Sequence, residues 1–369
     1  MKFVAALGIW IGMATAWGGP MPPIQKVFVI VLENHNWSDF KSNSSAPYLN
    51  GTLLRTASYC EDYHNPPGIH PSLPNYLWLE AGTNFGIFDD NNPATDHQNT
   101  TNHLVTLLQG RGISWKAYQE DIDGLHVPLS NVNGYAVRHD PFVYFDDVTG
   151  TNNSNYGYGI AHIRPYTELA ADLTNNTVAR YNFITPNLCD DGHDLCAPLY
   201  DSIRQTDNWL ATQMPPILNS AAYRSGGAIF ILWDESDATD RPIGMVVLSP
   251  LARGNGYANH IHYTHSSLVR TIQEIFGVTP FLADAAKATD LSDLFYPFAL
   301  RNASSIPGGG IQFTATGLIP GWTAVLEAST DFASWVPLST NLATTNSLVF
   351  TNYPPSNLIN RFYHVVQRP

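Results

Sequence analysis

The chain has 369 residues, and its 31 acidic against 18 basic side chains give a formal net charge of −13. This excess of acid would repel the phosphate backbone of a nucleic acid, so the composition argues against a nucleic-acid partner. The length suits one large α/β domain and a small accessory module.

The first 16 residues have the pattern of a signal peptide. Lys2 provides the positive start, residues 3–13 are apolar, and residues 14–16 (Ala-Thr-Ala) form a cleavage site of small residues. The apolar stretch is shorter than the ~20 residues that a membrane-spanning helix needs, and no later segment is long and apolar enough. We therefore expect a protein without a transmembrane segment that is secreted, periplasmic or held at the cell surface.

Residues 24–301 alternate between strand and helix patterns, which predicts a catalytic domain with a mostly parallel sheet flanked by helices. Continuous apolar runs predict strands at residues 27–32, 181–185, 228–233 and 244–248. Helical patterns cover residues 72–81, 102–109, 166–173, 203–218 and 266–276. Functional groups in such open sheets gather at the carboxyl ends of the strands.

The composition changes after about residue 302. Residues 302–310 contain the run SSIPGGG and are predicted to form a flexible linker. Residues 311–369 are predicted to form a small all-β module, with short strands at 311–316, 324–329, 335–338, 348–351 and 361–366. This module resembles the β-rich modules that end many secreted bacterial proteins, which implies a surface or sorting partner.

Ser72 is the candidate nucleophile because it lies where the helix 72–81 is predicted to begin. A helix N-terminus presents free N–H groups and partial positive charge, which stabilise a serine alkoxide and hold phosphate oxygens. Pro74 in the first turn fits this placement. The alternative is that Ser72 only caps the helix.

Acidic side chains follow two of the predicted strands. Glu33 and Asn34 come after the first strand, and Asp234 and Glu235 come after the strand 228–233. Together with Ser72, the three carboxylates would make an oxygen-rich cation site that suits Mg²⁺, Ca²⁺ or Mn²⁺ better than a soft metal, with zinc left open. The alternative is that these acids are solvated or cap a helix.

Two further segments carry histidines. His193 lies in an Asp-rich loop that Cys189 and Cys196 could close by a disulfide, and it could protonate a leaving group or contact phosphate. A simple surface turn is the alternative for this loop. His265 begins the helix 266–276, where it could contact an anion or a second metal, whereas His260 and His262 fit surface or packing positions better. Cys60 has no obvious partner.

Six segments in series resemble a known family. They are VFVIVLENHNWSDF, HPSLPNYLWLEAG, SWKAYQED, ITPNLCDDGHD, ILWDESD and HYTHSSLVRTIQEIFG, in order within residues 27–277. They are similar to the phosphoesterases of the alkaline phosphatase superfamily that include bacterial acid phosphatases and phospholipases C.

The resemblance implies an alkaline-phosphatase-like sheet and a divalent metal held by Glu33, Ser72, Asp234 and Glu235. It places Asn34 near the metal and phosphate, aligns Ser72 with the family nucleophile, and puts His193 and His265 on motif positions.

Two departures from the family pattern favour a phosphomonoesterase with a small phosphate ester substrate. Phospholipase C members carry TxPNR where this chain has SLPNY, and an Asp-His-Val triplet that is missing after Asp234 and Glu235. A phospholipase C-type phosphodiesterase is the first alternative. A non-catalytic surface-binding protein is the second, and the chain contains no GxSxG motif of a serine esterase.

Overall fold

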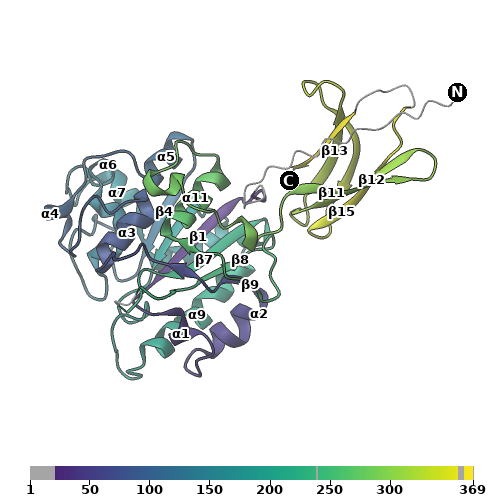
Figure 1. Cartoon of the computed structure of the whole chain (residues 1–369). Helices are drawn as coiled ribbons and strands as arrows, with labels where there is room; N and C mark the ends of the chain where they lie inside the picture. The colour runs from purple at the N-terminus through teal and green to yellow at the C-terminus, as the bar shows by residue number, and fades with distance from the viewer. Residues whose placement is uncertain (1–20, 238–239, 356–360, 369) are drawn as a thin grey trace.

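A computed structural model describes residues 21–237, 240–355 and 361–368 of the chain. The predicted signal peptide lies outside the described residues. Figure 1 shows a larger unit of helices around a sheet, followed by a smaller unit made of strands. No helix in the described part is long and apolar enough to cross a membrane.

The larger unit is built on an eight-stranded, mostly parallel sheet, as predicted. Its strand order is β5-β4-β6-β1-β7-β8-β2-β9. The central strand β1 pairs in parallel with both β6 and β7, so that Val27 lies opposite Tyr181 and Ala228. The strands are β1 (Lys26–Leu32), β2 (Ser58–Cys60), β4 (Trp115–Gln119), β5 (Ile163–Pro165), β6 (Tyr181–Thr185), β7 (Gly227–Trp233), β8 (Met245–Leu248) and β9 (Tyr257–Asn259).

Strand β8 runs antiparallel to its neighbours β7 and β2, contrary to the prediction that residues 244–248 join the parallel set. No helix lies between β7 and β8 among the residues that the structure describes there. A parallel neighbour needs a crossover of a dozen or more residues, usually a helix, whereas an antiparallel neighbour accepts a short return. The apolar run alone does not contain this information.

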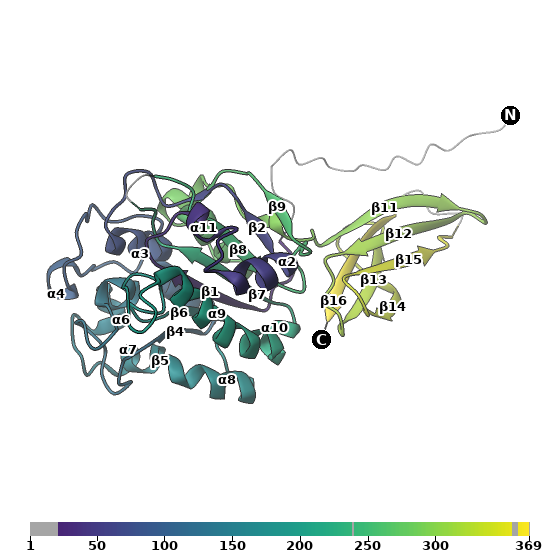
Figure 2. The same ribbon diagram turned by 90° about the horizontal axis from the view of Figure 1, so that it is seen from below.

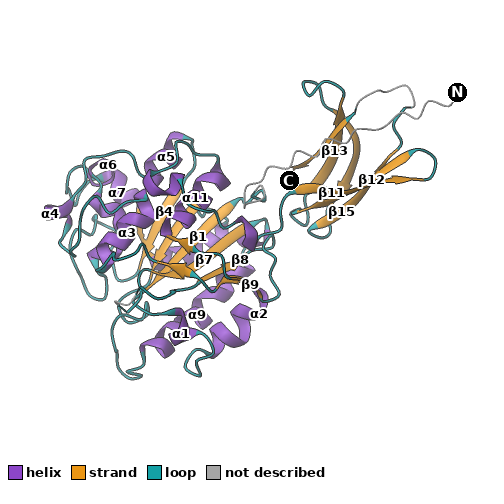
Figure 3. Cartoon of the chain, in the orientation of Figure 1, coloured by secondary structure: helices purple, strands orange, loops and turns teal. Residues whose placement is uncertain are grey.

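Helices cover both faces of the sheet (Figure 3). In Figures 1 and 2, α3 and α11 lie on one side of the sheet and α9 on the other. The longer helices are α3 (Ser72–Ala81), α5 (Leu104–Gly110), α8 (Leu169–Asn175), α9 (Ser202–Asn219) and α11 (His265–Phe276). Shorter ones are α1 (Trp37–Phe40), η1 (Leu49–Leu53), α2 (Leu54–Thr56), α4 (Pro93–Asp96), η2 (Val137–His139), η3 (Pro141–Tyr144), α6 (Asp146–Thr149), α7 (Gly157–His162), η4 (Tyr166–Glu168), α10 (Ala221–Arg224), η5 (Ala283–Ala286) and η6 (Ser292–Leu294).

A separate two-stranded parallel sheet joins β3 (Tyr63–His64) to β10 (Tyr263–Thr264). Strand β10 leads directly into α11, which begins at His265, and residues 65–71 connect β3 to the start of α3 at Ser72. The sequence patterns did not predict this sheet, since each strand has only two residues.

The smaller unit consists of two antiparallel sheets around its own apolar core, which includes Phe313, Leu326 and Phe350. The sheet orders are β11-β12-β15 and β14-β13-β16. The strands are β11 (Ala299–Ile306), β12 (Gly310–Thr316), β13 (Thr323–Ser329), β14 (Val336–Leu342), β15 (Ser347–Asn352) and β16 (Phe362–Arg368).

The region predicted as a flexible linker differs from that expectation. Most of residues 302–310 belongs to β11, which forms a hairpin with β12. Gly308 and Gly309 turn the chain with φ angles of 84° and 79°, a conformation that glycine adopts without strain. The glycine run therefore forms a tight turn between two strands.

Candidate active site

The carboxyl ends of β1 and β7 bring the predicted acidic residues together. Glu33 follows β1 and Asp234 follows β7, and the two strands are direct neighbours. The backbone N–H of Asp234 donates to the carbonyl of Leu32 at 2.9 Å, which continues the strand pairing into the site. The N–H of Glu33 donates to the carbonyl of Asp191 at 3.0 Å, which ties the loop after β6 to the same edge.

Ser72 is the first residue of α3 and is 2% exposed. Its Oγ donates a hydrogen bond to Glu33 Oε2 at 3.1 Å. Pro71 occupies the capping position, and the nearby N–H of Leu73 donates to Asp90 Oδ1 at 2.9 Å. Ser72 is therefore not the cap of this helix, and its hydroxyl points to the strand-end acids.

Glu33 is fully buried and receives contacts from three side chains. Besides Ser72, the hydroxyl of Tyr76 donates to Glu33 Oε1 at 2.5 Å, and His139 Nε2 lies 3.3 Å from the same oxygen. Tyr76 and the ring of His139 stack with centroids 5.1 Å apart. These contacts fix the Glu33 carboxylate against the start of α3.

Asn34 connects the two acids that follow β7. Its backbone N–H donates to Asp234 Oδ1 at 3.2 Å, and its side-chain amide donates to Glu235 Oε1 at 3.1 Å. Glu235 also accepts a hydrogen bond from Asn75 at 3.3 Å and pairs with His70 Nδ1. The segments around Asn34, Ser72 and Asp234 thus meet at one place.

Four buried carboxyl groups at this edge have raised pKa values. Burial is the main cause for each, and repulsion from Asp234 adds to it for the other three. The pKa of Asp234 rises to about 7 and that of Glu235 to about 9. The remaining two are Glu33 and Asp191. Such a group of buried acids needs protons or a cation to offset the loss of hydration.

The oxygen atoms here fit a hard divalent cation. Asn34 Oδ1 and Asp234 Oδ2 are buried, and neither oxygen accepts a hydrogen bond of good geometry. The Ser72 hydroxyl is close to the Asp234 carboxyl and lowers its pKa, against the larger effect of burial. Carboxylate, amide and hydroxyl oxygens are the ligands that Mg²⁺, Ca²⁺ and Mn²⁺ prefer.

The predicted metal ligands are linked by hydrogen bonds. Ser72 bonds to Glu33, and Asn34 bonds to both Asp234 and Glu235. Among the described residues, the group of metal-type donors at this edge whose ligand atoms all lie within 4.8 Å of one another consists of Glu33, His139 and Asp191, and it does not include Asp234 or Glu235. Burial lowers the pKa of His139 well below its usual value, so its ring is neutral and able to accept a metal. The structure thus adds His139 and Asp191 as candidate ligands beside Glu33.

His193 lies at the outer side of the site. Its Nε2 is 3.2 Å from Arg138 Nη2, and its Nδ1 is 2.7 Å from Asp194 Oδ1. Its ring centroid is 6.0 Å from that of His139, and its side chain is 31% exposed. His193 is therefore accessible to a substrate that enters from solvent.

His265 has a different environment. Its ring is fully buried, with Nε2 2.6 Å from the carbonyl oxygen of Asp234 and Nδ1 3.2 Å from the hydroxyl of Tyr63. Because a carbonyl only accepts, Nε2 carries the proton, and Nδ1 accepts from Tyr63. Burial lowers the pKa of His265 to about 4, although the bond to Asp234 opposes this. A neutral ring with both nitrogens engaged holds the Asp234 backbone in place.

The predicted disulfide is confirmed. Cys189 and Cys196 are bonded with Cα atoms 5.6 Å apart, and they enclose Asp191 and His193. Cys60 is a buried free cysteine whose thiol donates to the carbonyl of Ile261.

Sequence reasoning did not identify Arg138 and His139 as site residues. Both lie in η2, a short turn between β4 and β5 with no periodic pattern to mark it. The run Arg-His-Asp within an otherwise apolar segment (YAVRHDPFVYF) was the available signal. The contact between this turn and Glu33 is visible only in the tertiary structure.

A family model matches the part of the chain that contains most of the candidate site. A model of the phosphoesterase family matches residues 38–279. The chain belongs to this family. The matched range contains Ser72, Asp234, Glu235 and both candidate histidines, while Glu33 and Asn34 lie just before it.

The phosphoesterase family relatives include curated enzymes. A phosphate-repressible acid phosphatase of Penicillium chrysogenum is 29% identical over 57% of this chain and 50% of that enzyme. A phosphatidylinositol-3-phosphatase of Mycobacterium tuberculosis is 25% identical over 77% of this chain and 89% of that enzyme. The chain thus spans about half the length of the Penicillium enzyme and most of the mycobacterial one.

Among solved structures, a protein in the alkaline phosphatase superfamily from Vibrio parahaemolyticus aligns with a TM-score of 0.48 at 9% identity. That alignment covers 88% of this chain and 85% of the Vibrio protein.

Proposed function

We propose that this protein is a metal-dependent phosphomonoesterase of acid-phosphatase type that acts through a phosphoserine at Ser72. The observation that carries the proposal is the buried Ser72 hydroxyl at the start of α3, bonded to Glu33 and close to Asp234. Membership of the phosphoesterase family and the acid phosphatase relatives support the same class of reaction.

In the proposed reaction, Ser72 Oγ attacks phosphorus in line with the leaving oxygen. The hydroxyl proton passes along the existing hydrogen bond to Glu33 Oε2. The bond from phosphorus to the leaving oxygen breaks, and this oxygen takes a proton as the alcohol departs. Water then attacks the phosphoserine and gives one proton to the group that protonated the alcohol. The bond from phosphorus to Ser72 Oγ breaks, Oγ takes back the proton held by Glu33, and inorganic phosphate leaves.

Two histidines were predicted as proton donors, and their surroundings favour His193. The ring of His193 is partly exposed, beside Arg138 and Asp194, whereas the ring of His265 is fully buried between Asp234 and Tyr63. A general acid contributes about 10² to 10⁴ in rate. We assign His265 the role of positioning Asp234, and we assign Arg138 and Asn34 to the phosphate oxygens.

Glu33, Ser72, Asp234 and Glu235 would hold the divalent cation, for which Mg²⁺, Ca²⁺ or Mn²⁺ fit the oxygen donors and zinc is left open. Such a cation, when bound, neutralises phosphate charge and lowers the pKa of a serine hydroxyl. The start of α3 at Ser72 also places the positive end of the helix dipole at this point, which favours an anion.

The test compares wild type with Ser72→Ala on two substrates, a small aromatic phosphate monoester and phosphatidylcholine. We expect hydrolysis of the monoester, and a loss of at least about 10³-fold in kcat/KM for the variant. Ser225→Ala, at an exposed position after α10, is the matched control and should keep full activity. Acid quenching during turnover should trap one phosphoryl group on wild type and none on Ser72→Ala.

The alternatives give different results in the same experiment. Cleavage of phosphatidylcholine without cleavage of the monoester would assign a phospholipase C-type phosphodiesterase. Absence of hydrolysis with every divalent ion would support a non-catalytic binding protein. Undiminished phosphate release by Ser72→Ala would refute the nucleophile.

We also propose export of the protein and a surface or sorting role for the C-terminal β module. The signal-peptide pattern and the Cys189–Cys196 disulfide support export. Mass analysis of the N-terminus of protein recovered from the medium or periplasm tests it, with cleavage after Ala16 expected.

A further inference from the structure

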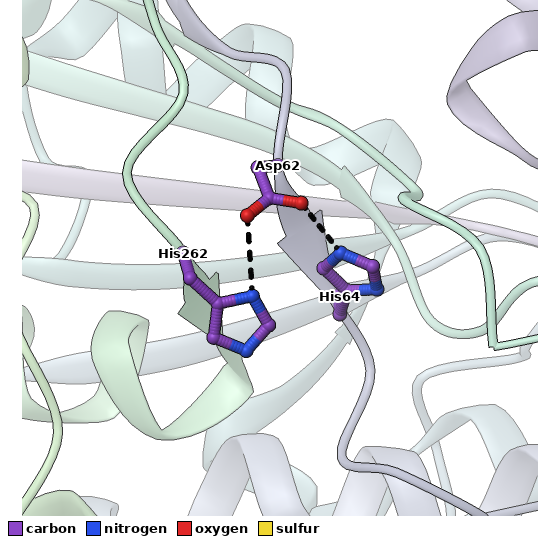
Figure 4. A group of neighbouring side chains, drawn as sticks. All are labelled: Asp62, His64 and His262. Carbon is purple, nitrogen blue, oxygen red and sulfur yellow. Dashed lines mark hydrogen bonds and ion pairs between the residues drawn. The ribbon is translucent and has the colours of Figure 1, made fainter.

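Three side chains meet on the two-stranded sheet beside the active site, and none of them takes part in the proposed reaction. They are Asp62, which precedes β3, His64, which is in β3, and His262, which precedes β10. Figure 4 shows both histidine rings pointing toward the carboxylate of Asp62. Among the described residues, they form one of two groups whose potential metal ligands all lie within 4.8 Å of one another.

The strand register explains why these three residues share a face. Tyr63 pairs with Tyr263, and both tyrosines are buried on the inner side. Because side chains alternate along a strand, Asp62 and His64 point to the other side, and so does His262, one residue before Tyr263. Two short segments that are 200 residues apart thus present one carboxylate and two imidazoles outward.

The contacts place suitable donor atoms toward one point. His64 Nε2 is 2.8 Å from Asp62 Oδ1, and His262 Nδ1 is 3.3 Å from Asp62 Oδ2. The two imidazole rings have centroids 5.0 Å apart. The side chains of His64 and His262 are 17% and 61% exposed, so an ion can reach them from solvent.

We propose that Asp62, His64 and His262 form a second metal site, for a divalent transition ion such as Zn²⁺. Imidazole nitrogen suits zinc, copper and nickel, and three protein ligands with one open position make a common zinc geometry. The catalytic edge offers mainly oxygen atoms, which suit Mg²⁺, Ca²⁺ or Mn²⁺. The two sites therefore differ in their donor atoms, with more nitrogen at Asp62, His64 and His262 and more oxygen at the catalytic edge.

An ion at this site would join β3 to β10 and so stiffen a connection to the active site. Tyr63, between Asp62 and His64, donates its hydroxyl to His265, and His265 donates to the carbonyl of Asp234. The role of the site is therefore to hold these strands in register. The proposal does not depend on Ser72 being a nucleophile.

Zinc binding to the full chain tests the proposal. Wild type, His262→Gln, Asp62→Asn and His260→Gln are dialysed against Zn²⁺ with Mg²⁺ in large excess, and the bound zinc is counted by elemental analysis. We expect His262→Gln to bind one zinc ion fewer per chain than wild type. His260 is exposed in the same segment and belongs to neither of the two donor groups found among the described residues, so His260→Gln should bind as wild type does.

The Co²⁺ absorption spectrum gives a second readout that is independent of enzymatic activity. Wild type should show the visible bands of cobalt with nitrogen ligands, and both His262→Gln and Asp62→Asn should lose them. His262 is mostly exposed, so its replacement leaves the fold intact, which circular dichroism verifies. Equal zinc counts in wild type, His262→Gln and Asp62→Asn would overturn the proposal.

Discussion

Ser72 donates its hydroxyl hydrogen bond to Glu33, a residue 39 positions earlier in the chain, over 3.1 Å. Four residues later on the same helix, Tyr76 donates to the other oxygen of Glu33 at 2.5 Å. Residues four apart lie on one face of a helix, so α3 directs two hydroxyl groups at one carboxylate. The intervening Asn75 contacts Glu235, so a single helix start orients acids from both strand ends.

Replacing Tyr76 by Phe should reduce both stability and turnover. The buried Glu33 loses a donor, which costs about 1–3 kcal/mol in unfolding free energy. With its carboxylate less constrained, we expect kcat to fall about 10-fold, equivalent to roughly 1.4 kcal/mol in the barrier. Denaturant unfolding and steady-state kinetics measure the two effects. Tyr118→Phe removes a similar bond, to Asp172 at 2.7 Å on α8, and should lower stability without lowering kcat.

The acids at the strand ends were predictable because each follows a continuous apolar run. Glu33 ends one such run and Asp234 another, and parallel strands bring their carboxyl ends to one edge. Ser72 was predictable for a similar local reason, since proline and polar residues mark the start of α3. These signals lie within a few residues of the functional group itself.

The other site residues depend on the path of the chain. Arg138 and His139 lie in a turn between β4 and β5, and the packing of that turn against α3 brings His139 to Glu33. The direction of β8 and the hairpin at Gly308 and Gly309 were missed for the same reason. An apolar or glycine-rich run contains no information about which other segment of the chain it will pack against.

Chelation should remove activity and destabilise the protein. The carboxyls of Glu33, Asp191, Asp234 and Glu235 are buried together, so a bound cation offsets their repulsion. A ligand present at about 100 times its Kd stabilises the native state by about 3 kcal/mol. We expect a lower Tm after dialysis with a chelator, and recovery of Tm and turnover on addition of Mg²⁺, Ca²⁺ or Mn²⁺. Full activity in excess chelator would contradict the proposed metal dependence.

Arg138 should contribute to substrate binding. Its guanidinium lies 3.2 Å from His193 and 3.6 Å from Asp90, at the outer side of the site. From this position its N–H groups can also donate to phosphate oxygens. We expect Arg138→Gln to raise KM about 10- to 100-fold and to weaken inhibition by inorganic phosphate, because a charge-assisted hydrogen bond contributes about 1.5–3 kcal/mol. Arg138→Lys should be intermediate, since lysine lacks the two-pronged geometry.

Arg111→Gln, at an exposed position after α5, is the control for the loss of positive charge. Its KM should equal that of wild type. An unchanged KM and unchanged phosphate inhibition in Arg138→Gln would remove Arg138 from the binding site.

A buried histidine away from Ser72 should make stability depend on pH. His103 is fully buried, with Nδ1 2.8 Å from Glu80 Oε1 and Nε2 3.0 Å from Asp147 Oδ1. Burial alone lowers the pKa of His103, but bonds to Asp147 and Glu80 outweigh burial and raise it to about 9. Burial also raises the pKa of Glu80, which offsets part of the gain.

Because the pKa of His103 is higher in the folded state than its unfolded value of about 6.5, the charged ring stabilises the fold fully below pH 6.5. That contribution, of the order of 3 kcal/mol, should be lost as the pH rises through 9. Urea unfolding of wild type and His103→Gln at pH 6 to 10 measures it, and the difference between them should shrink with increasing pH. His126→Gln, whose exposed ring pairs with Asp123, should follow wild type throughout. A difference between wild type and His103→Gln that stays constant from pH 6 to 10 would show that His103 stabilises the fold by packing against Phe145, with its ring 3.8 Å away, rather than by its charge.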